Sequence, residues 1–190
     1  FDRGDLATAE KLLKEAEKIS LVPKYNALQL YWMGEVAYAQ GDMERAVECY
    51  EAYMRRAPKS AKEYNFAHYG VGYAHFNRGE MDAAAASFNE FVRGYTNRDN
   101  YLYDAQNRLG DARFALRDFA NARKAYKVVE QSASELRHYA GYQMAMVDGI
   151  DQRAEDKIER LKAIVAENEG GYVDDAWYEL GRSYIAQEQY

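Results

Sequence analysis

Apolar residues recur three or four positions apart along most of the chain, and nowhere does the alternation typical of a β-strand persist. This spacing places the apolar side chains on one face of each of a series of helices. Short polar segments separate the helical stretches, among them Gly41-Asp42, Arg78-Gly79 and Arg117-Asp118. Pro23 and Pro58 each follow a helical stretch and are expected to end it. The pattern therefore predicts an all-α protein.

Ten helices are predicted, and most of them form pairs joined by a tight turn. Their ranges are 6–19, 27–40, 43–56, 63–77, 81–94, 101–116, 119–131, 134–147, 154–168 and 172–190. In the third pair Arg117 stands where the first two turns have glycine, so this turn is expected to take a form that accepts a side chain. Between the helices of the fourth pair we expect a loop over residues 148–151.

One interval runs through three consecutive helix pairs. Glycine, alanine and an aromatic residue each recur every 38 residues (72 − 34 and 110 − 72 for the glycines), at Gly34, Gly72 and Gly110, at Ala46, Ala84 and Ala122, and at Tyr50, Phe88 and Tyr126. A fixed period of this length indicates stacked repeats, and such arrays usually hold a partner rather than convert a substrate. Ala145 is the best candidate for the small position of a fourth, degenerate repeat.

The predicted organisation is one repeat array over residues 1–190. It comprises the second helix of a truncated repeat (1–22), three repeats (27–60, 65–98 and 103–133), a degenerate repeat (134–171) and the first helix of a truncated repeat (172–190). Because both ends divide a repeat, the chain is expected to be a fragment of a longer solenoid.

The recurring small residues predict close packing. Glycine within a helix costs roughly 1 kcal/mol relative to alanine, so its recurrence implies a compensating gain. We expect Gly34, Gly72, Gly110 and Gly181 to remove a side chain where the paired helices approach closely, with the recurring alanines doing the same from the other helix. The recurring aromatic rings would then fill the seam towards the next repeat.

These residues resemble the tetratricopeptide repeat (TPR) family. A complete first-helix signature is formed by Trp177, Leu180, Gly181 and Tyr184. The best whole repeat contains Leu30, Met33, Gly34, Gly41-Asp42, Ala46, Tyr50 and Pro58, and the next two contain Val71, Gly72, Gly79, Ala84 and Phe88, then Leu109, Gly110, Ala122 and Tyr126. The interval of 38 exceeds the family's 34, and His68 and Gln106 occupy the usual tryptophan position. The resemblance implies a right-handed α-solenoid of stacked antiparallel helix pairs, the TPR superhelix.

A narrower resemblance concerns location. The long loops, the abundant tyrosine and the segment 172–181 look like bacterial cell-envelope TPR proteins of the outer-membrane-assembly lipoprotein and Tol–Pal accessory types. This resemblance implies a place in the bacterial periplasm or cell envelope, with the cytoplasm as the alternative.

Charge and composition exclude several classes of partner. The net charge is −6, and no basic stripe of the kind that binds nucleic acid is visible. A single cysteine, Cys49, permits no intrachain disulfide. The apolar runs are too short for a bilayer span, so this segment is not expected to insert into a membrane. Eighteen tyrosines indicate helix packing, a contact surface or both.

The candidate binding residues form an aromatic ladder on the first helix of each repeat, which the resemblance implies lines a concave groove. They are Tyr31, Glu35, Tyr38, Phe66, Tyr69, Tyr73, Phe76, Asn107, Asp111, Phe114, Tyr142, Met146, Tyr178 and Arg182. Residues seven apart on a helix share a face, so the rings of one helix project together. Aromatic residues and arginine are enriched at binding surfaces. The alternative is that these rings only pack between neighbouring helices.

No catalytic or cofactor chemistry is indicated. His68 and His75 share a helix face, but a metal site would need further ligands, and both lie at repeat packing positions. Cys49 is expected to act as a small hydrophobic residue beside Tyr50. No phosphate loop or triad spacing is found, so we expect neither an enzyme nor a cofactor protein.

Three functions follow, in order of preference. The first is a protein–protein interaction scaffold that binds a peptide or partner helix of unknown identity in the aromatic-lined groove. The second is a structural spacer or assembly segment of a larger bacterial envelope complex. The remote third is a glycan-binding part of an envelope enzyme, since aromatic grooves also stack sugars.

Overall fold

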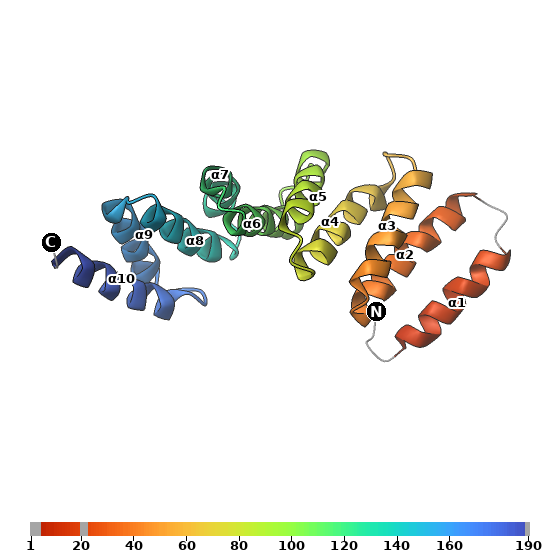
Figure 1. Ribbon diagram of the computed structural model, residues 1–190, viewed down its shortest axis with the longest axis horizontal. Helices are drawn as coiled ribbons and strands as arrows, with labels where there is room; N and C mark the ends of the chain where they lie inside the picture. The colour runs from red at the N-terminus through yellow and green to blue at the C-terminus, as the bar shows by residue number, and fades with distance from the viewer. Residues whose placement is uncertain (1–4, 20–22, 189–190) are drawn as a thin grey trace. The chain divides into compact units, whose positions relative to one another are not determined.

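The computed structural model describes residues 5–19 and 23–188, and the regular structure within them is entirely helical (Figure 1). The helices are α1 (Leu6–Ile19), α2 (Pro23–Gln40), α3 (Met43–Arg56), α4 (Lys62–Asn77), α5 (Met81–Gly94), α6 (Asn100–Ala115), α7 (Phe119–Glu130), α8 (Arg137–Ile150), α9 (Ala154–Glu167) and α10 (Val173–Glu188). The predicted all-α class is confirmed, while residues 189–190 of the last predicted helix lie outside the described residues.

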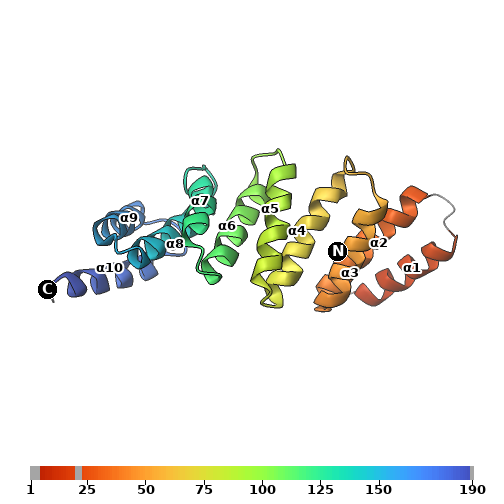
Figure 2. The same ribbon diagram turned by 45° about the horizontal axis from the view of Figure 1, so that its top comes forward.

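The helices divide into two compact units, and the boundary between them along the chain lies between Thr96 and Asn97. In the first unit each helix packs against the next, and α2 also contacts α4 (Figure 2). Tyr50 of α3 lies at the centre of this unit's core, which includes Tyr31 and Ala37 of α2 and Val71 of α4. A helix pair therefore buries its apolar stripe together with the following helix, as in an α-solenoid.

The second unit contains α6 to α10, and each of these helices also packs against the next. One apolar cluster centres on Tyr126 of α7 and Met144 of α8. A second cluster joins Leu161 of α9 to Leu180 of α10. The first helix of each pair (α2, α4, α6, α8) is hereafter called helix A and the second (α3, α5, α7, α9) helix B, and α10 is grouped with helix A because it carries the sequence signature of a first helix.

The turns from helix A to helix B share one backbone conformation. Gly41, Gly79, Arg117 and Gln152 all have positive φ, between 58° and 84°. The residue after each donates its backbone N–H to a carbonyl five residues earlier, for example Asp42 to Ala37. The turn at Arg117 does accept a side chain, as expected, and it does so in the same left-handed geometry as the glycine turns, with a φ of 61°. The side chain is accepted at a cost in backbone strain.

The fourth pair follows a shorter interval than the others. Its left-handed residue, Gln152, lies 35 residues after Arg117 (152 − 117). α8 continues to Ile150, so the loop predicted at 148–151 is wrong and begins only after Ile150. The single glycine of this stretch, Gly149, remains within the helix.

The same shift of 35 residues sets the packing of the fourth pair. It places Ala145 and Leu161 where the third pair has Gly110 and Tyr126, and both are fully buried. Leucine is smaller than tyrosine, so alanine can stand opposite it where a ring required glycine. The repeat signature is not recognisable in the fourth pair because the glycine and the aromatic residue are both replaced, by Ala145 and Leu161.

Two helix starts, those of α2 and α8, differ from the prediction by three residues or more. Pro23 is the first residue of α2 and does not end the preceding helix, because proline lacks only a hydrogen bond that the first helical residue does not make. Pro58, by contrast, follows the end of α3 as expected. α8 begins at Arg137 and not at Ser134, since the Ser132 and Ser134 hydroxyls accept backbone N–H bonds in a separate turn.

Candidate functional site

Each recurring glycine makes room for an aromatic ring. A Cβ atom at Gly34 would lie 2.7 Å from the ring of Tyr50, and one at Gly72 would lie 2.8 Å from the ring of Phe88. Gly110 has the same relation to Tyr126. The glycines therefore admit a ring from helix B of the same pair, which refines the expectation of a close helix approach. Gly181 differs, because no described atom lies within 4 Å of a Cβ built there.

The hydroxyl of that ring meets an acidic residue of helix A. Tyr50 donates to Glu35 Oε1 at 2.7 Å, and Tyr126 donates to Asp111 Oδ1 at 2.8 Å. In the second pair Phe88 has no hydroxyl, and Tyr73 takes the position of the acid with its ring centroid 5.3 Å from that of Phe88. The acid is thus present where the ring can donate and absent where it cannot.

Burial controls the ionisation of these groups. Desolvation, followed by the charge of Glu35, raises the pKa of Tyr50, and Asp111 acts in the same way on Tyr126. The pKa of Asp111 is also raised by burial, although hydrogen bonds from Tyr139 and Tyr126 and the charge of Arg108 oppose this. The tyrosines therefore remain neutral donors at physiological pH.

The predicted site residues of the first unit form what we call the first helix-A face: Tyr31, Glu35, Tyr38, Phe66, Tyr69, Tyr73 and Phe76. Its rings contact one another between helices and within a helix. The ring centroids of Tyr38 in α2 and Tyr73 in α4 lie 6.4 Å apart, and those of Tyr69 and Tyr73, both in α4, lie 5.0 Å apart. Except for Tyr31, these residues are half-buried. The rings are fixed by their neighbours and keep a surface exposed.

Tyr31 has a different environment from the rest of this face. It is only 8% exposed, and its ring centroid lies 5.8 Å from that of Tyr50 and 5.5 Å from that of Tyr53. Its main role is therefore in the core, which is the alternative that the sequence left open. The neighbouring Trp32 is 38% exposed and touches the edge of Tyr31.

The predicted site residues of the second unit form the second helix-A face: Asn107, Asp111, Phe114, Tyr142, Met146, Tyr178 and Arg182. Asp111 is the hub on α6, because Tyr126, Tyr139 and Arg108 all donate to it. Phe114 packs edge-on against Phe119. On α10, Tyr178 is exposed and Arg182 lies over its ring. Asp111 and its partners thus join α6, α7 and α8.

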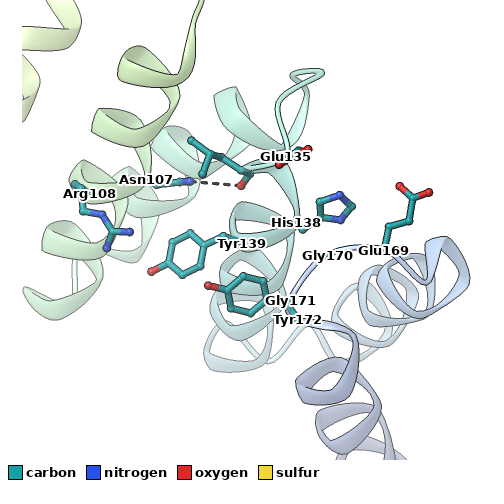
Figure 3. A pocket seen from close by; sticks show the side chains of 10 residues that line it. Asn107, Arg108, Glu135, His138, Tyr139, Glu169, Gly170, Gly171 and Tyr172 are labelled. Carbon is teal, nitrogen blue, oxygen red and sulfur yellow. Dashed lines mark hydrogen bonds between the residues drawn. The ribbon is translucent and has the colours of Figure 1, made fainter.

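A hollow of about 520 Å³ lies beside this hub, between α6, the start of α8 and the segment before α10. Figure 3 shows Arg108 and the rings of Tyr139 and Tyr172 along it. Asn107, only 1% exposed, donates to the carbonyl of Leu136 at 3.4 Å. Its amide oxygen has no hydrogen-bond partner among the described residues. The hollow is therefore lined by a cation, Arg108, and by two rings, those of Tyr139 and Tyr172.

Three side chains near the two faces were missed by the sequence reasoning: Trp32, Arg108 and Tyr172. Trp32 and Arg108 occupy equivalent positions of the 38-residue interval, but Gly70 lies between them at the same position, so the three differ in type and gave no periodic signal. Tyr172 stacks on Tyr142 with ring centroids 5.6 Å apart, yet it lies between helices. The positive-φ turn residues are the signal that fixes the register of the fourth pair, and they are visible only in the backbone.

The histidines and the cysteine do not form a reactive site. His75 contacts Glu80 at 2.6 Å, whereas His68 lies edge-on to Tyr64. Burial raises the pKa of the Cys49 thiol, which keeps it protonated. Throughout residues 5–19 and 23–188, no three His, Cys, Asp or Glu side chains gather closely enough to hold a metal ion. Within those same residues, no helix combines the length and apolar character needed to cross a membrane.

Comparisons with known proteins agree with this geometry. A family model for the tetratricopeptide repeat matches residues 1–61 and 31–99, just over half of the chain. Among curated proteins no sequence matches.

Solved structures resemble the chain in fold. The crystal structure of MamA has a TM-score of 0.73 at 18% identity, covering 87% of this chain and 90% of that one. YrrB, described as a TPR protein with an unusual peptide-binding site, has a TM-score of 0.72 at 17% identity, covering 93% and 84%. A tetratricopeptide repeat protein from Parabacteroides merdae has a TM-score of 0.73 at 18% identity, covering 99% and 73%.

Proposed function

Because the chain belongs to the tetratricopeptide repeat family, we propose that it is a non-catalytic scaffold that binds a peptide or a partner helix along its helix-A faces. The observation that carries this proposal is the row of half-buried rings on the first helix-A face, held by contacts such as Tyr38 to Tyr73 and Tyr73 to Phe88. Similar solved structures include YrrB, whose description names a peptide-binding site.

Rigid rings suit binding for an energetic reason. A free side chain loses roughly 0.5–1.5 kcal/mol of rotamer freedom when a partner immobilises it. Tyr69 and Tyr73 are already held by ring contacts with Phe88, so most of this loss occurs on folding. Their exposed surface can then bury apolar area of a partner, and a tyrosine hydroxyl can donate to a peptide carbonyl.

A selection experiment tests the proposal. Peptides selected from a random displayed library against the intact protein would be titrated by calorimetry. The double variant Tyr38→Ala/Phe76→Ala should weaken their binding at least tenfold, because it removes two rings from the face. Circular dichroism would verify that the helices remain. Tyr101→Ala, an exposed tyrosine outside both faces, is the matched control and should bind as the wild type does. Equal affinity in the double variant would argue against this face.

A second candidate is an assembly segment, and one observation favours it. α10 exposes four large apolar side chains: Trp177, Tyr178, Tyr184 and Ile185. Apolar surface of this kind is stabilised by contact with another chain. Placing that assembly in a bacterial envelope rests on the sequence resemblance alone. Light scattering should show a mass that rises with concentration and falls to that of the monomer in Trp177→Ser/Ile185→Ser, whereas a strict monomer would contradict this candidate.

A further inference from the structure

The first unit has an apolar hollow of about 780 Å³ that is not lined by the named residues of the first helix-A face. It lies where α2 begins, α3 ends and α4 begins, and we call it the α3-end pocket. Leu28, Tyr53 and Ala57 line its inner surface, and Arg56, Lys62 and Glu63 are among the residues at its rim. This volume lies within the range of pockets that hold small ligands or the side chains of a peptide.

The second repeat shows what fills the same place. Tyr95 occupies there the position that Ala57 occupies in the first repeat, 38 residues earlier (95 − 57). Both residues follow the last turn of helix B in extended backbone conformations, with φ and ψ of −84° and 147° for Ala57 and of −95° and 120° for Tyr95. Each donates its N–H to the carbonyl four residues earlier at 2.8 Å. The two backbones therefore aim the side chain alike.

The side chains at this position differ greatly. The ring of Tyr95 stacks on Phe91 with centroids 4.7 Å apart and planes 21° apart, and it meets the edge of Phe66 at 5.6 Å. Tyr53 and Leu28 are the first repeat's equivalents of Phe91 and Phe66. Ala57 supplies only a methyl group to them, so the ring that completes the cluster in the second repeat is missing and the hollow remains.

We propose that the α3-end pocket binds the aromatic side chain of an acidic peptide. The proposal rests on the scaffold function but concerns a pocket whose lining includes none of the named residues of the two helix-A faces. An inserted ring would pack against Leu28 and Ala57 and against the small part of Tyr53 that borders the pocket, gaining apolar burial and aromatic contact. Burial and the charge of Glu63 raise the pKa of Tyr53 to about 12, which keeps the inner surface neutral.

The charged side chains at the rim of the pocket indicate the charge of the partner. Arg56 and Lys62 form no ion pair among the described residues, and Lys59 on the same loop also lacks one. Glu63 is the carboxylate at this rim, whereas the chain as a whole carries a net charge of −6. Carboxylates next to the inserted ring could pair with Arg56 and Lys62, while a basic peptide would be repelled by them.

Peptide titration monitored by NMR tests the proposal. The probe is the blocked pentapeptide Asp-Glu-Tyr-Glu-Asp, added to the full chain labelled with ¹⁵N. We expect saturable shifts centred on the amides of Tyr53, Ala57 and Lys62. The pentapeptides Asp-Glu-Ala-Glu-Asp and Lys-Lys-Tyr-Lys-Lys should bind at least tenfold more weakly, because each removes one of the two recognised features.

A substitution taken from the second repeat provides the decisive variant. Ala57→Tyr should place a ring in the pocket, weaken the probe at least tenfold and keep or raise the melting temperature, since the same backbone accepts Tyr95. Ala57→Ser leaves the pocket open and is the matched control that should bind normally.

Two results would overturn the proposal: a probe that shifts no amide around the pocket, or a probe that binds Ala57→Tyr as well as it binds Ala57→Ser. Neither result bears on the helix-A faces, because the peptides selected for those faces are tested with Tyr38→Ala/Phe76→Ala. Equal affinity of the selected peptides for the wild type and for Tyr38→Ala/Phe76→Ala, together with binding of the probe at the pocket, would contradict the first proposal and leave this one standing.

Discussion

The glycines at Gly34, Gly72 and Gly110 each form one half of a glycine–ring pair with a residue sixteen positions later (50 − 34). The sequence showed both halves because they recur at one interval. It did not show that they face each other, and it did not show that a hydroxyl on the ring requires an acid such as Glu35. That requirement depends on the distance between two side chains, which periodicity alone does not fix.

A pair of alanine substitutions tests the glycine–ring pair. Gly72→Ala should lower the free energy of unfolding by about 1–3 kcal/mol, because its Cβ would lie 2.8 Å from the Phe88 ring and force the core to shift. Gly181→Ala, in the same register but facing open space among the described residues, should raise it by up to about 1 kcal/mol through helix propensity. Urea unfolding measures both, and a stabilising Gly72→Ala would refute the pairing.

The ends of the helices depend on the backbone geometry of the turns as much as on the pattern of apolar residues. The helix pairs were predictable because glycine marks two of their turns, at Gly41 and Gly79. The fourth pair was misread because Gln152 adopts the left-handed conformation without being glycine, and nothing in the sequence marks it. The start of α2 was misread for a related reason, since a proline can begin a helix as well as follow one.

Reciprocal substitutions in the turns test this account. Arg117→Gly should raise the free energy of unfolding by about 1 kcal/mol, because a side chain at a φ of 61° is strained and glycine is not. Gly79→Ala, at a φ of 76°, should lower it by a similar amount. Thermal and urea unfolding report both changes. Changes of the same sign in the two variants would show that the turns do not share one geometry.

The contact of α1 with α2 and α3 is expected to weaken in acid, because Glu10 of α1 takes part in it through Gln40 and Arg45. Glu10 of α1 pairs with Lys14 and Arg45 and accepts from Gln40, and these contacts lower its pKa to about 2. Because the folded pKa lies below the ordinary 4.5, the carboxylate stabilises the contact of α1 with α2 and α3 at neutral pH. This contribution is lost as the pH falls from about 4.5 towards 2.

A ¹³C titration of the Glu10 carboxyl group measures this pKa directly. The midpoint should lie near 2 in the wild type and rise towards 4.5 in Arg45→Met. The effect on stability should be modest, because most of these groups remain partly in water. A wild-type midpoint near 4.5 would show that the contacts between α1 and its neighbours do not form in solution.

At the scale of the whole molecule, each compact unit has its own core and its own helix-A face. The all-α repeat architecture was predictable, because stacked helix pairs must repeat their small and aromatic residues to pack. The exposure of the candidate site residues was less predictable: periodicity selected Tyr31, which is buried in the core, and passed over Trp32, which is more exposed. The 38-residue period identifies the residues that all repeats need for packing, but it does not show how exposed each side chain is.

The central claim is that the helix-A faces hold a peptide. It is tested most directly by ¹⁵N NMR of the full chain during titration with the tightest peptide selected from a random library. The largest amide shifts should fall on α2 and α4, around Tyr38, Tyr73 and Phe76, and should saturate with one binding constant. Saturable shifts centred instead on the exposed side of α3, around Glu44 and Glu48, would contradict the claim.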